Sequence, residues 1–254
     1  MAEAPAYVIL GRGRWAKKMQ PILAGEGRAA TTFGETRQRP SESVESYVSR
    51  LSEAMAASRA QVAWLCVVPG PHVSLMVQAA LEAGLHVIAE KPWYGSAADT
   101  ERLQAMAHKK RRLLAVHFQY LVHREAENWR RTFYPGAGLR FGGNFFLSRP
   151  DHIGIPAMDN LVCHLMAIRE FAVPASEISE LQCAYERPDE RLVWLESSGQ
   201  RIASIDLLKG SERIIQDFVK KVEAALGGAA FAFDLDFALR VENQLNAYKA
   251  RCPR

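Results

Sequence analysis

Short apolar runs recur along the first half of the chain, separated by stretches in which apolar residues have helical spacing. Strands that are covered on both faces of a sheet are almost continuously apolar. The apolar runs therefore predict five buried strands, at residues 7–10, 29–33, 62–68, 86–89 and 113–117. Helices are expected between them, at about 15–24, 41–55, 72–83 and 97–110. This alternation predicts right-handed crossovers and a doubly wound, parallel Rossmann sheet.

The pattern changes after residue 117. The elements expected there are a helix at 124–132, a strand at 139–147, a helix at 157–171, and strands at 178–185, 191–196 and 201–208. Successive strands without helices between them favour an antiparallel sheet. Two further helices are expected at 211–226 and 235–250. We therefore predict an α/β protein with a Rossmann domain over 1–120 and a smaller α+β domain, with an open, mostly antiparallel sheet, over 121–254.

Composition narrows the class of protein. The chain has 254 residues, of which 48% are hydrophobic and 24% charged, which suits two globular domains rather than a disordered chain. A net charge of +4 is too small to indicate a nucleic-acid partner, and no basic face with interleaved aromatic residues is found. The first residues do not show the basic-then-apolar pattern of a signal peptide, and no apolar run approaches the length needed to span a bilayer, so neither a signal peptide nor a membrane span is expected. Its cysteines form no CxxC pair, which indicates reduced thiols. We expect a cytoplasmic protein without nucleic-acid or membrane partners.

The first predicted strand leads directly into a GxGxxA sequence, Gly11-Arg12-Gly13-Arg14-Trp15-Ala16. In such a sequence the first glycine permits a sharp turn, the second leaves room for a diphosphate, and the small third residue lets helix and strand pack closely. The motif alone is a weak signal, and a plain glycine-rich turn is the alternative. Its position between a predicted strand and a predicted helix favours the dinucleotide site. The expected cofactor is NAD(P)(H), bound by Gly11, Gly13, Arg14, Trp15 and Ala16.

The adenosine ribose should bind at the end of the second strand, roughly 20 residues beyond the glycines. Glu35 lies there and favours the 2′-hydroxyl of NAD, whereas Arg37 and Arg39 favour the 2′-phosphate of NADP. All three are also compatible with ordinary solvated loop charges. The sequence therefore leaves NAD and NADP as alternatives. Val68 and Pro69 follow the third strand and are expected at the same cofactor-binding edge of the sheet.

The next strand is preceded by a helix that ends at glycine, giving Ala83-Gly84-Leu85-His86-Val87, and it is followed by Glu90-Lys91-Pro92. With the glycine-rich turn and the loop proline, this pattern resembles the Gfo/Idh/MocA oxidoreductase family over residues 7–117. The resemblance implies hydride transfer between nicotinamide C4 and a carbonyl/alcohol or imine/amine carbon of a small polar metabolite, such as a sugar. It also implies a homo-oligomer and a cis peptide bond before Pro92.

The resemblance also assigns roles to individual residues. Lys91 would move the proton of the reacting oxygen or nitrogen, and Glu90 would position the loop; both are also expected to contact the cofactor. Burial near a cationic nicotinamide lowers a lysine pKa, which suits acid–base work near neutral pH. In the second domain the family's Asp or Asn four residues before a His is matched by Asn160 and His164, which share one helix face. His164 would be a second proton carrier. The competing interpretations are a surface lysine and a core histidine.

Four further residues are weaker candidates for substrate contact. His117 and Tyr120 follow the last Rossmann strand, where the family places residues near the nicotinamide and substrate. Asp151 and His152 follow the long strand of the second domain.

No metal site is predicted, because the second-domain histidines do not have the HExxH or CxxC spacing of recognisable zinc sites. The alternative function is a catalytically silent NAD(P)-binding sensor or scaffold of the same fold. A Lys91→Ala protein that keeps its biological activity while still binding NAD(P)H would indicate that alternative.

Overall fold

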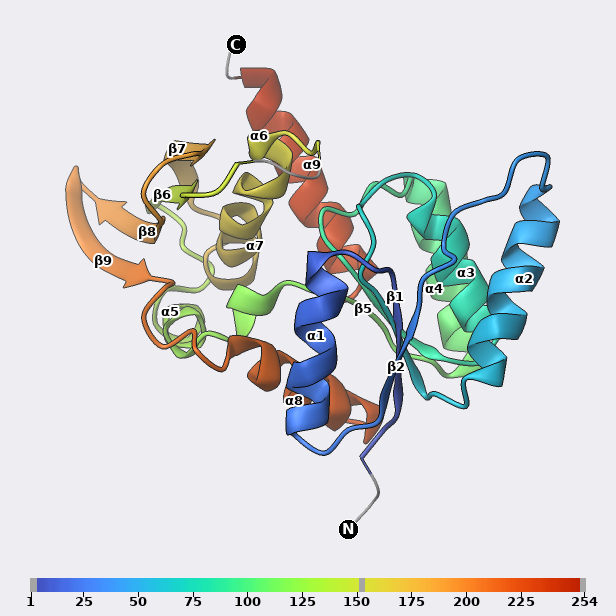
Figure 1. Ribbon diagram of the computed structural model, residues 1–254. Coiled ribbons are helices and arrows are strands. Elements are labelled where there is room, and N and C mark those ends of the chain that lie inside the picture. Colours follow the sequence, from blue (N-terminus) through green and yellow to red (C-terminus); the bar gives the residue numbers. More distant parts are fainter. Residues whose placement is uncertain (1–3, 151–153, 252–254) are drawn as a thin grey trace. The chain divides into compact units, whose positions relative to one another are not determined.

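The computed structural model describes residues 4–150 and 154–251, and the chain divides into two compact units (Figure 1). The first unit consists of Met1–His117 together with Val222–Leu239, and the second of Phe118–Lys221 together with Arg240–Arg254. The predicted division at residue 120 does not include this late return of the chain to the first unit. No helix of the described residues is long and apolar enough to cross a membrane.

Five parallel strands form the sheet of the first unit, in the order β2-β1-β3-β4-β5. They are β1 (Tyr7–Leu10), β2 (Ala30–Phe33), β3 (Val62–Leu65), β4 (His86–Ala89) and β5 (Leu114–Val116). The predicted doubly wound sheet is therefore confirmed. Because β2 and β3 lie on opposite sides of β1, the direction of winding reverses there. Such a switch point is where open α/β sheets bind ligands, at the carboxyl ends of the strands.

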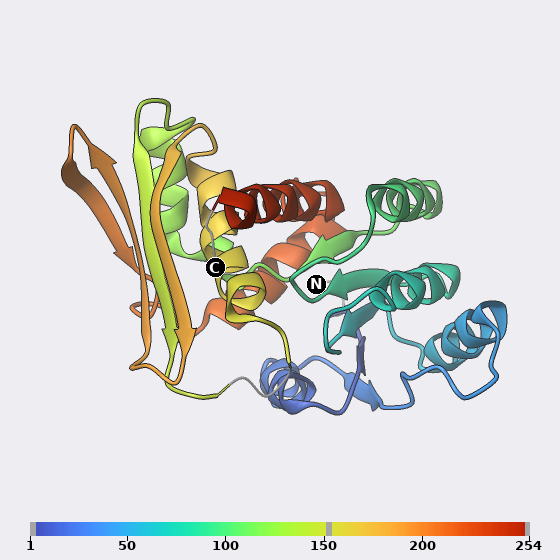
Figure 2. The ribbon, with the colours of Figure 1, turned by 90° about the horizontal axis from the view of Figure 1, so that it is seen from above.

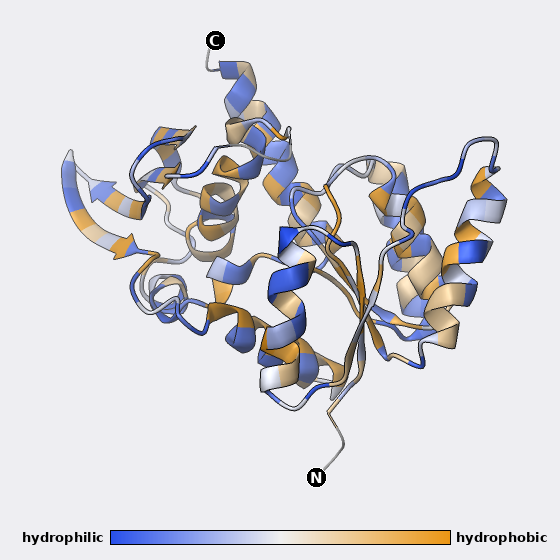
Figure 3. Cartoon of the chain, in the orientation of Figure 1, coloured by the Kyte–Doolittle hydropathy of each residue, from blue (hydrophilic) through white to orange (hydrophobic). Residues whose placement is uncertain are grey.

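The helices of this unit are α1 (Arg14–Gly25), α2 (Val44–Ala57), α3 (Val73–Glu82) and α4 (Ala97–Lys110). Serine side chains begin two of them: Ser43 accepts a hydrogen bond from the amide of Ser46, and Ser96 accepts one from the amide of Asp99. Every residue of β1 and β3 is buried. Figure 3 shows the hydrophobic colour concentrated in the central strands, as expected for a sheet covered on both faces.

The returning segment joins the edge of this sheet. Between α8 (Ile214–Leu226) and α9 (Leu235–Arg251), Phe233 accepts a backbone hydrogen bond from Val116 at 2.7 Å. Asp234 forms an isolated antiparallel bridge with Ala115. The side chain of Phe233 is 1% exposed. The segment thus covers the apolar edge at β5.

The second unit contains a four-stranded sheet in the order β7-β6-β8-β9. Its strands are β6 (Arg140–Leu147), β7 (Glu177–Tyr185), β8 (Glu190–Ser197) and β9 (Gln200–Asp206). The pairs β6–β8 and β8–β9 are antiparallel, which confirms the predicted mostly antiparallel sheet, whereas β6–β7 is parallel. Helices lie between β6 and β7 in the sequence and return the chain in the same direction.

Those helices are α6 (Ala157–Asn160) and α7 (Val162–Ala172), which replace the single helix predicted over 157–171. They follow a short 3-10 helix, η1 (Gln119–Val122), and α5 (Arg124–Phe133). Figure 2 shows α7 along one side of the sheet. The core of the unit lies between them, where Leu165 of α7 approaches Gly143 of β6.

Candidate functional site

The turn between β1 and α1 contains two glycines with different roles. Gly11 has φ +120°, a conformation that favours glycine, and a Cβ there would overlap the carbonyl oxygen of Cys66. Gly13 has an ordinary φ of −71°, and a Cβ there would meet no atom within 4 Å. Gly11 is therefore required by the fold. The absent side chain of Gly13 instead keeps space open beside the N-terminus of α1.

That end of α1 is suited to an anion. Its N-cap residue, Gly13, provides no side-chain hydrogen bond, and the first turn contains no acidic residue. The amide groups of a first helical turn carry a positive partial charge and have no partner within the helix. Such a helix end binds phosphate groups. Ala16 is buried, as the small third residue of the motif should be, while Arg14 is exposed.

A pocket of about 660 Å³ opens at the carboxyl ends of β1, β2 and β3, next to this turn. Its volume lies within the range of roughly 300–1,000 Å³ that is typical of small-molecule sites. Its lining comes from the turn at 11–13, the loop at 34–39, Tyr47 and Arg50 of α2, and the segment 66–68 with His72. Five of the predicted cofactor residues are therefore brought together here: Gly11, Gly13, Glu35, Arg37 and Val68. Pro69 does not line this pocket.

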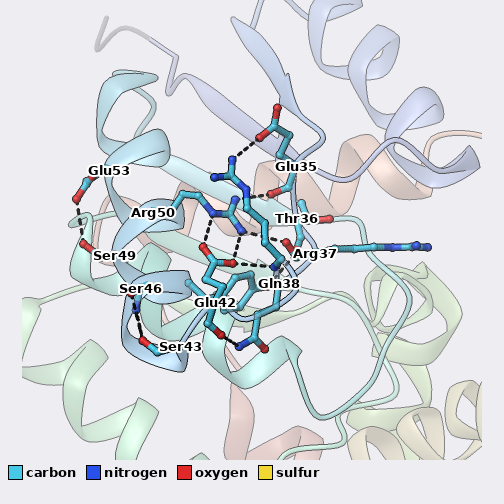
Figure 4. Close-up of polar contacts among 12 residues, drawn as sticks. Glu35, Thr36, Arg37, Gln38, Glu42, Ser43, Ser46, Ser49, Arg50 and Glu53 are labelled. Carbon is cyan, nitrogen blue, oxygen red and sulfur yellow. Dashed lines mark hydrogen bonds and ion pairs between the residues drawn. The ribbon is translucent and has the colours of Figure 1, made fainter.

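The loop after β2 is held by an ion pair that sequence reasoning missed. Arg50 of α2 donates to both carboxylate oxygens of Glu42, at 2.7 and 3.0 Å, and also to the carbonyl oxygens of Glu35 and Arg37, each at 3.0 Å (Figure 4). These hydrogen bonds from Arg50, followed by one from the Arg39 amide, lower the pKa of Glu42 to about 2. The backbone on both sides of Thr36 is therefore fixed from α2.

Two arginines alter the charge expected at the end of β2. Gly34 follows β2 directly, and a Cβ at this position would overlap the guanidinium of Arg12. Arg12 was not among the predicted cofactor residues, because it occupies the variable position of the GxG motif. Glu35 follows Gly34, but its exposed carboxylate forms an ion pair with Arg39 at 3.1 Å. The first residue after β2 that has a side chain is thus an acid that is already paired.

Glu90 lies at the centre of a second cluster in the same unit. Its Oε1 accepts hydrogen bonds from Nε1 of Trp15 at 2.6 Å, from Nε1 of Trp64 at 3.1 Å, and from Nδ1 of His117 at 3.0 Å. Trp64 and His117 are 0% and 1% exposed. A single carboxylate therefore ties α1, β3 and the end of β5 to the end of β4.

This cluster supports the predicted positioning role of Glu90 for the segment that follows it. Lys91 is partly buried, and the Lys91–Pro92 peptide bond is cis, as the resemblance implied. The ring nitrogen Nδ1 of His117, a predicted substrate residue, is used by Glu90. Sequence reasoning did not foresee Trp64 as a member of this cluster, because it is hidden within an apolar strand.

Predicted substrate residues of the second unit form a cluster of their own. The His164 ring stacks on Phe145 with centroids 5.1 Å apart and meets Tyr120 edge-on at 4.9 Å. Arg191 donates to the Tyr120 hydroxyl at 2.6 Å, and burial raises the pKa of that hydroxyl. Asn160, the last residue of α6, instead donates to the hydroxyl of Tyr185 at 2.7 Å.

Asp151 and His152 lie outside the described residues, so their predicted role stays a prediction. Among the residues that the structure describes, no three His, Cys, Asp or Glu side chains gather as a metal site would require.

Comparison with known proteins identifies the first domain. Residues 6–118 match the Gfo/Idh/MocA oxidoreductase family, described by its NAD-binding Rossmann fold. The match covers the Rossmann part of the chain. The predicted resemblance to this family, and with it the predicted nicotinamide dinucleotide class of cofactor, is thereby confirmed. No curated protein sequence matches the chain significantly.

Solved structures share the fold over nearly the whole chain. The UDP-N-acetylglucosamine 3-dehydrogenase GnnA from Acidithiobacillus ferrooxidans matches with a TM-score of 0.74, 14% identity, and coverage of 97% of each chain. GenD2 from gentamicin A biosynthesis, solved with NAD, matches with a TM-score of 0.74, 15% identity, and coverage of 98% of this chain and 95% of that one.

An inositol dehydrogenase homologue from Azotobacter vinelandii, solved with NADH and myo-inositol, matches with a TM-score of 0.64 and 14% identity. That alignment covers 96% of this chain and 94% of the homologue. At these identities the comparison shows a shared fold.

Proposed function

We propose that this protein is an NAD(P)-dependent oxidoreductase that transfers a hydride between nicotinamide C4 and a carbonyl/alcohol or imine/amine carbon of a small polar metabolite. The observation that carries the proposal is the open space at Gly13, beside a helix N-terminus and a pocket at the switch point of the sheet. The match of the first domain to an oxidoreductase family supports the same reaction class.

The residues present fit a dinucleotide. Gly13 and the first amides of α1 would bind the diphosphate, and the loop held by Arg50 would contact the adenosine ribose. When bound, the cofactor supplies the hydride donor or acceptor. The chain's own contribution is to hold the dinucleotide and to move the proton that accompanies the hydride.

Lys91 is the proposed proton carrier, because it follows Glu90 at the carboxyl end of β4. The three hydrogen bonds to Glu90 fix the backbone that presents it. In the second unit His164, Tyr120 and Asn160 are the proposed substrate residues, with His164 as a second proton carrier. Their ring nitrogens, hydroxyl and amide are groups that bind sugar-like hydroxyls. GnnA and the myo-inositol complex, whose names indicate polyhydroxylated substrates, support that class.

A pair of glycine variants tests the proposal. Gly13→Ala should lower the thermal midpoint only slightly, through the poorer N-cap, because its φ is ordinary and its Cβ would meet nothing. The added methyl group should nevertheless displace the diphosphate and weaken nucleotide binding by about 10-fold or more. Gly11→Ala is the contrasting variant and should lower the thermal midpoint, because its Cβ would overlap the Cys66 carbonyl.

The measurement is a fluorescence titration with NADH and with NADPH, beside a thermal melt of each variant. The proposal fails if the unmodified protein binds neither nucleotide at micromolar concentration. It also fails if Gly13→Ala binds them as tightly as the unmodified protein.

A further inference from the structure

We infer that the pocket is built for the 2′-phosphate of NADP(H), and that Arg12 and Arg37 are the residues that select it over NAD(H). This inference rests on the proposed function and deepens it, since it concerns the adenosine end of the same cofactor site. Four observations carry it: the Arg12 guanidinium in the side-chain space of Gly34, the pairing of Glu35, the charge of the lining and the fixed backbone beside Arg37.

The position directly after β2 lacks the group that NAD requires. In NAD-binding Rossmann domains an acidic side chain at this edge accepts a hydrogen bond from the ribose 2′-hydroxyl. Here the residue is Gly34, and the space that a side chain would use is taken by the guanidinium of Arg12. A cation therefore stands where a carboxylate would favour the unphosphorylated ribose. A nearby arginine is the feature that accommodates a 2′-phosphate.

The remaining acid does not restore an NAD-type site. Among the described residues that line the pocket, Glu35 is the one acid. Its carboxylate is paired with Arg39 at 3.1 Å, and their side chains are 63% and 60% exposed. The Arg39 guanidinium beside this carboxylate offsets its negative charge, so the pocket lining presents a net positive charge to a phosphate.

The arginines of the lining are not equivalent. Arg50 is used by Glu42 and by two backbone carbonyls, and Arg39 is used by Glu35. Arg12 and Arg37 are exposed, and within the described part of the chain neither forms an ion pair. Figure 4 shows the Arg37 side chain extended away from the contacts of Arg50 and Glu42. Two planar guanidinium groups are therefore available to bind a phosphate dianion, for which their geometry is suited.

The backbone that carries Arg37 is already ordered. Arg50 donates to the carbonyl oxygens of Glu35 and Arg37, and the hydroxyl of Tyr47 donates to the carbonyl oxygen of Thr36 at 2.7 Å. Binding would then require ordering of the arginine side chains but not of the loop backbone. A preorganised loop reduces the entropic cost of binding, which favours a specific ribose-phosphate contact over a transient surface contact.

Equilibrium binding at constant ionic strength tests the inference without reference to turnover. Dissociation constants would be measured for NADPH and NADH by fluorescence, and for 2′,5′-ADP and 5′-AMP by calorimetry. The second pair differs in the phosphate at the ribose 2′ position and lacks the nicotinamide. We expect NADPH to bind about 10- to 100-fold more tightly than NADH, as one or two charge-assisted phosphate contacts allow. We expect 2′,5′-ADP to bind more tightly than 5′-AMP by a similar factor.

Arg12→Ala and Arg37→Ala assign the preference to residues. Each substitution should weaken the binding of NADPH and 2′,5′-ADP about 10-fold. The affinity for NADH should stay within about twofold, because the amides that would bind the diphosphate are unchanged. Arg102→Ala is the matched control. It removes one exposed arginine of the same unit, paired with Asp99 on α4 and absent from the pocket lining, and should change neither preference.

The outcomes separate this inference from the proposed function. If NADH binds as tightly as NADPH, or more tightly, the inference is wrong while the dinucleotide site stands. If the preference survives in the Arg12→Ala/Arg37→Ala double variant, the assignment to these arginines is wrong. If neither nucleotide binds, the proposed function itself fails. Retained NADH affinity in each variant shows that the pocket is still folded.

Discussion

Replacing Glu90 with alanine should destabilise the first unit, because it removes the acceptor shared by three N–H groups. Two of these donors belong to Trp64 and His117, which are 0% and 1% exposed and cannot turn toward water. The third belongs to Trp15, which is partly exposed. A buried polar group that loses its partner costs about 1–3 kcal/mol, so two of them lower the free energy of unfolding by about 2–6 kcal/mol.

Urea unfolding followed by tryptophan fluorescence measures this effect. Glu90→Gln retains an acceptor oxygen, so its free energy of unfolding should fall by less, about 1–2 kcal/mol. Only the charge-assisted part of each hydrogen bond is removed in this variant. Glu82→Ala is the control: this exposed glutamate of α3 accepts a hydrogen bond from Gln78 at 2.9 Å, and its loss should change the free energy by no more than about 0.5 kcal/mol.

The reasoning is refuted if Glu90→Ala unfolds within about 1 kcal/mol of the unmodified protein. It is also refuted if Glu90→Gln and Glu90→Ala lose the same free energy, since the retained oxygen would then be irrelevant.

Two further predictions concern other residues. Burial, and then the Asp159 carboxylate, raise the pKa of Glu242 to about 7, so the folded protein holds a proton that an unfolded chain releases above 4.5. The free energy of unfolding should therefore fall by about 1 kcal/mol, after allowance for screening, as pH rises from about 4.5 to 7. The thermal midpoint, measured over this pH range, should fall with it. An unchanged pH profile in Glu242→Gln would contradict this prediction. Lys91→Ala should abolish turnover while NAD(P)H still binds, and full turnover in that variant would remove Lys91 from the mechanism.

Local patterns were sufficient to predict much of the fold. The strands of the first unit are buried along their whole length at β1 and β3, so their apolar runs were visible. The helix expected from residue 97 likewise begins at Ala97. The parallel pairing of β6 with β7 was not predictable in this way. Apolar spacing shows that a segment is a strand, but the strand's partner depends on where α6 and α7 return the chain.

The same distinction between local and long-range contacts applies to the candidate site. Gly11 and Gly13 act through their own backbone, so a short motif was enough to place them. The cluster around Glu90 assembles side chains from four distant segments, and no spacing in the sequence relates Trp15 to Trp64. Arg50 gave no signal beyond its charge, because its partners are a carboxylate and carbonyls that come together only in the folded loop.

The return of residues 222–239 to the first unit affects how the protein can be made. During synthesis, β5 leaves the ribosome long before Phe233, whose carbonyl accepts the hydrogen bond of Val116. The cofactor-binding unit thus completes its sheet edge only after all of residues 118–221 have been translated. A nascent chain that stops before residue 222 would leave that edge exposed to aggregation. Cutting the gene at a single point therefore cannot release a complete nucleotide-binding fragment.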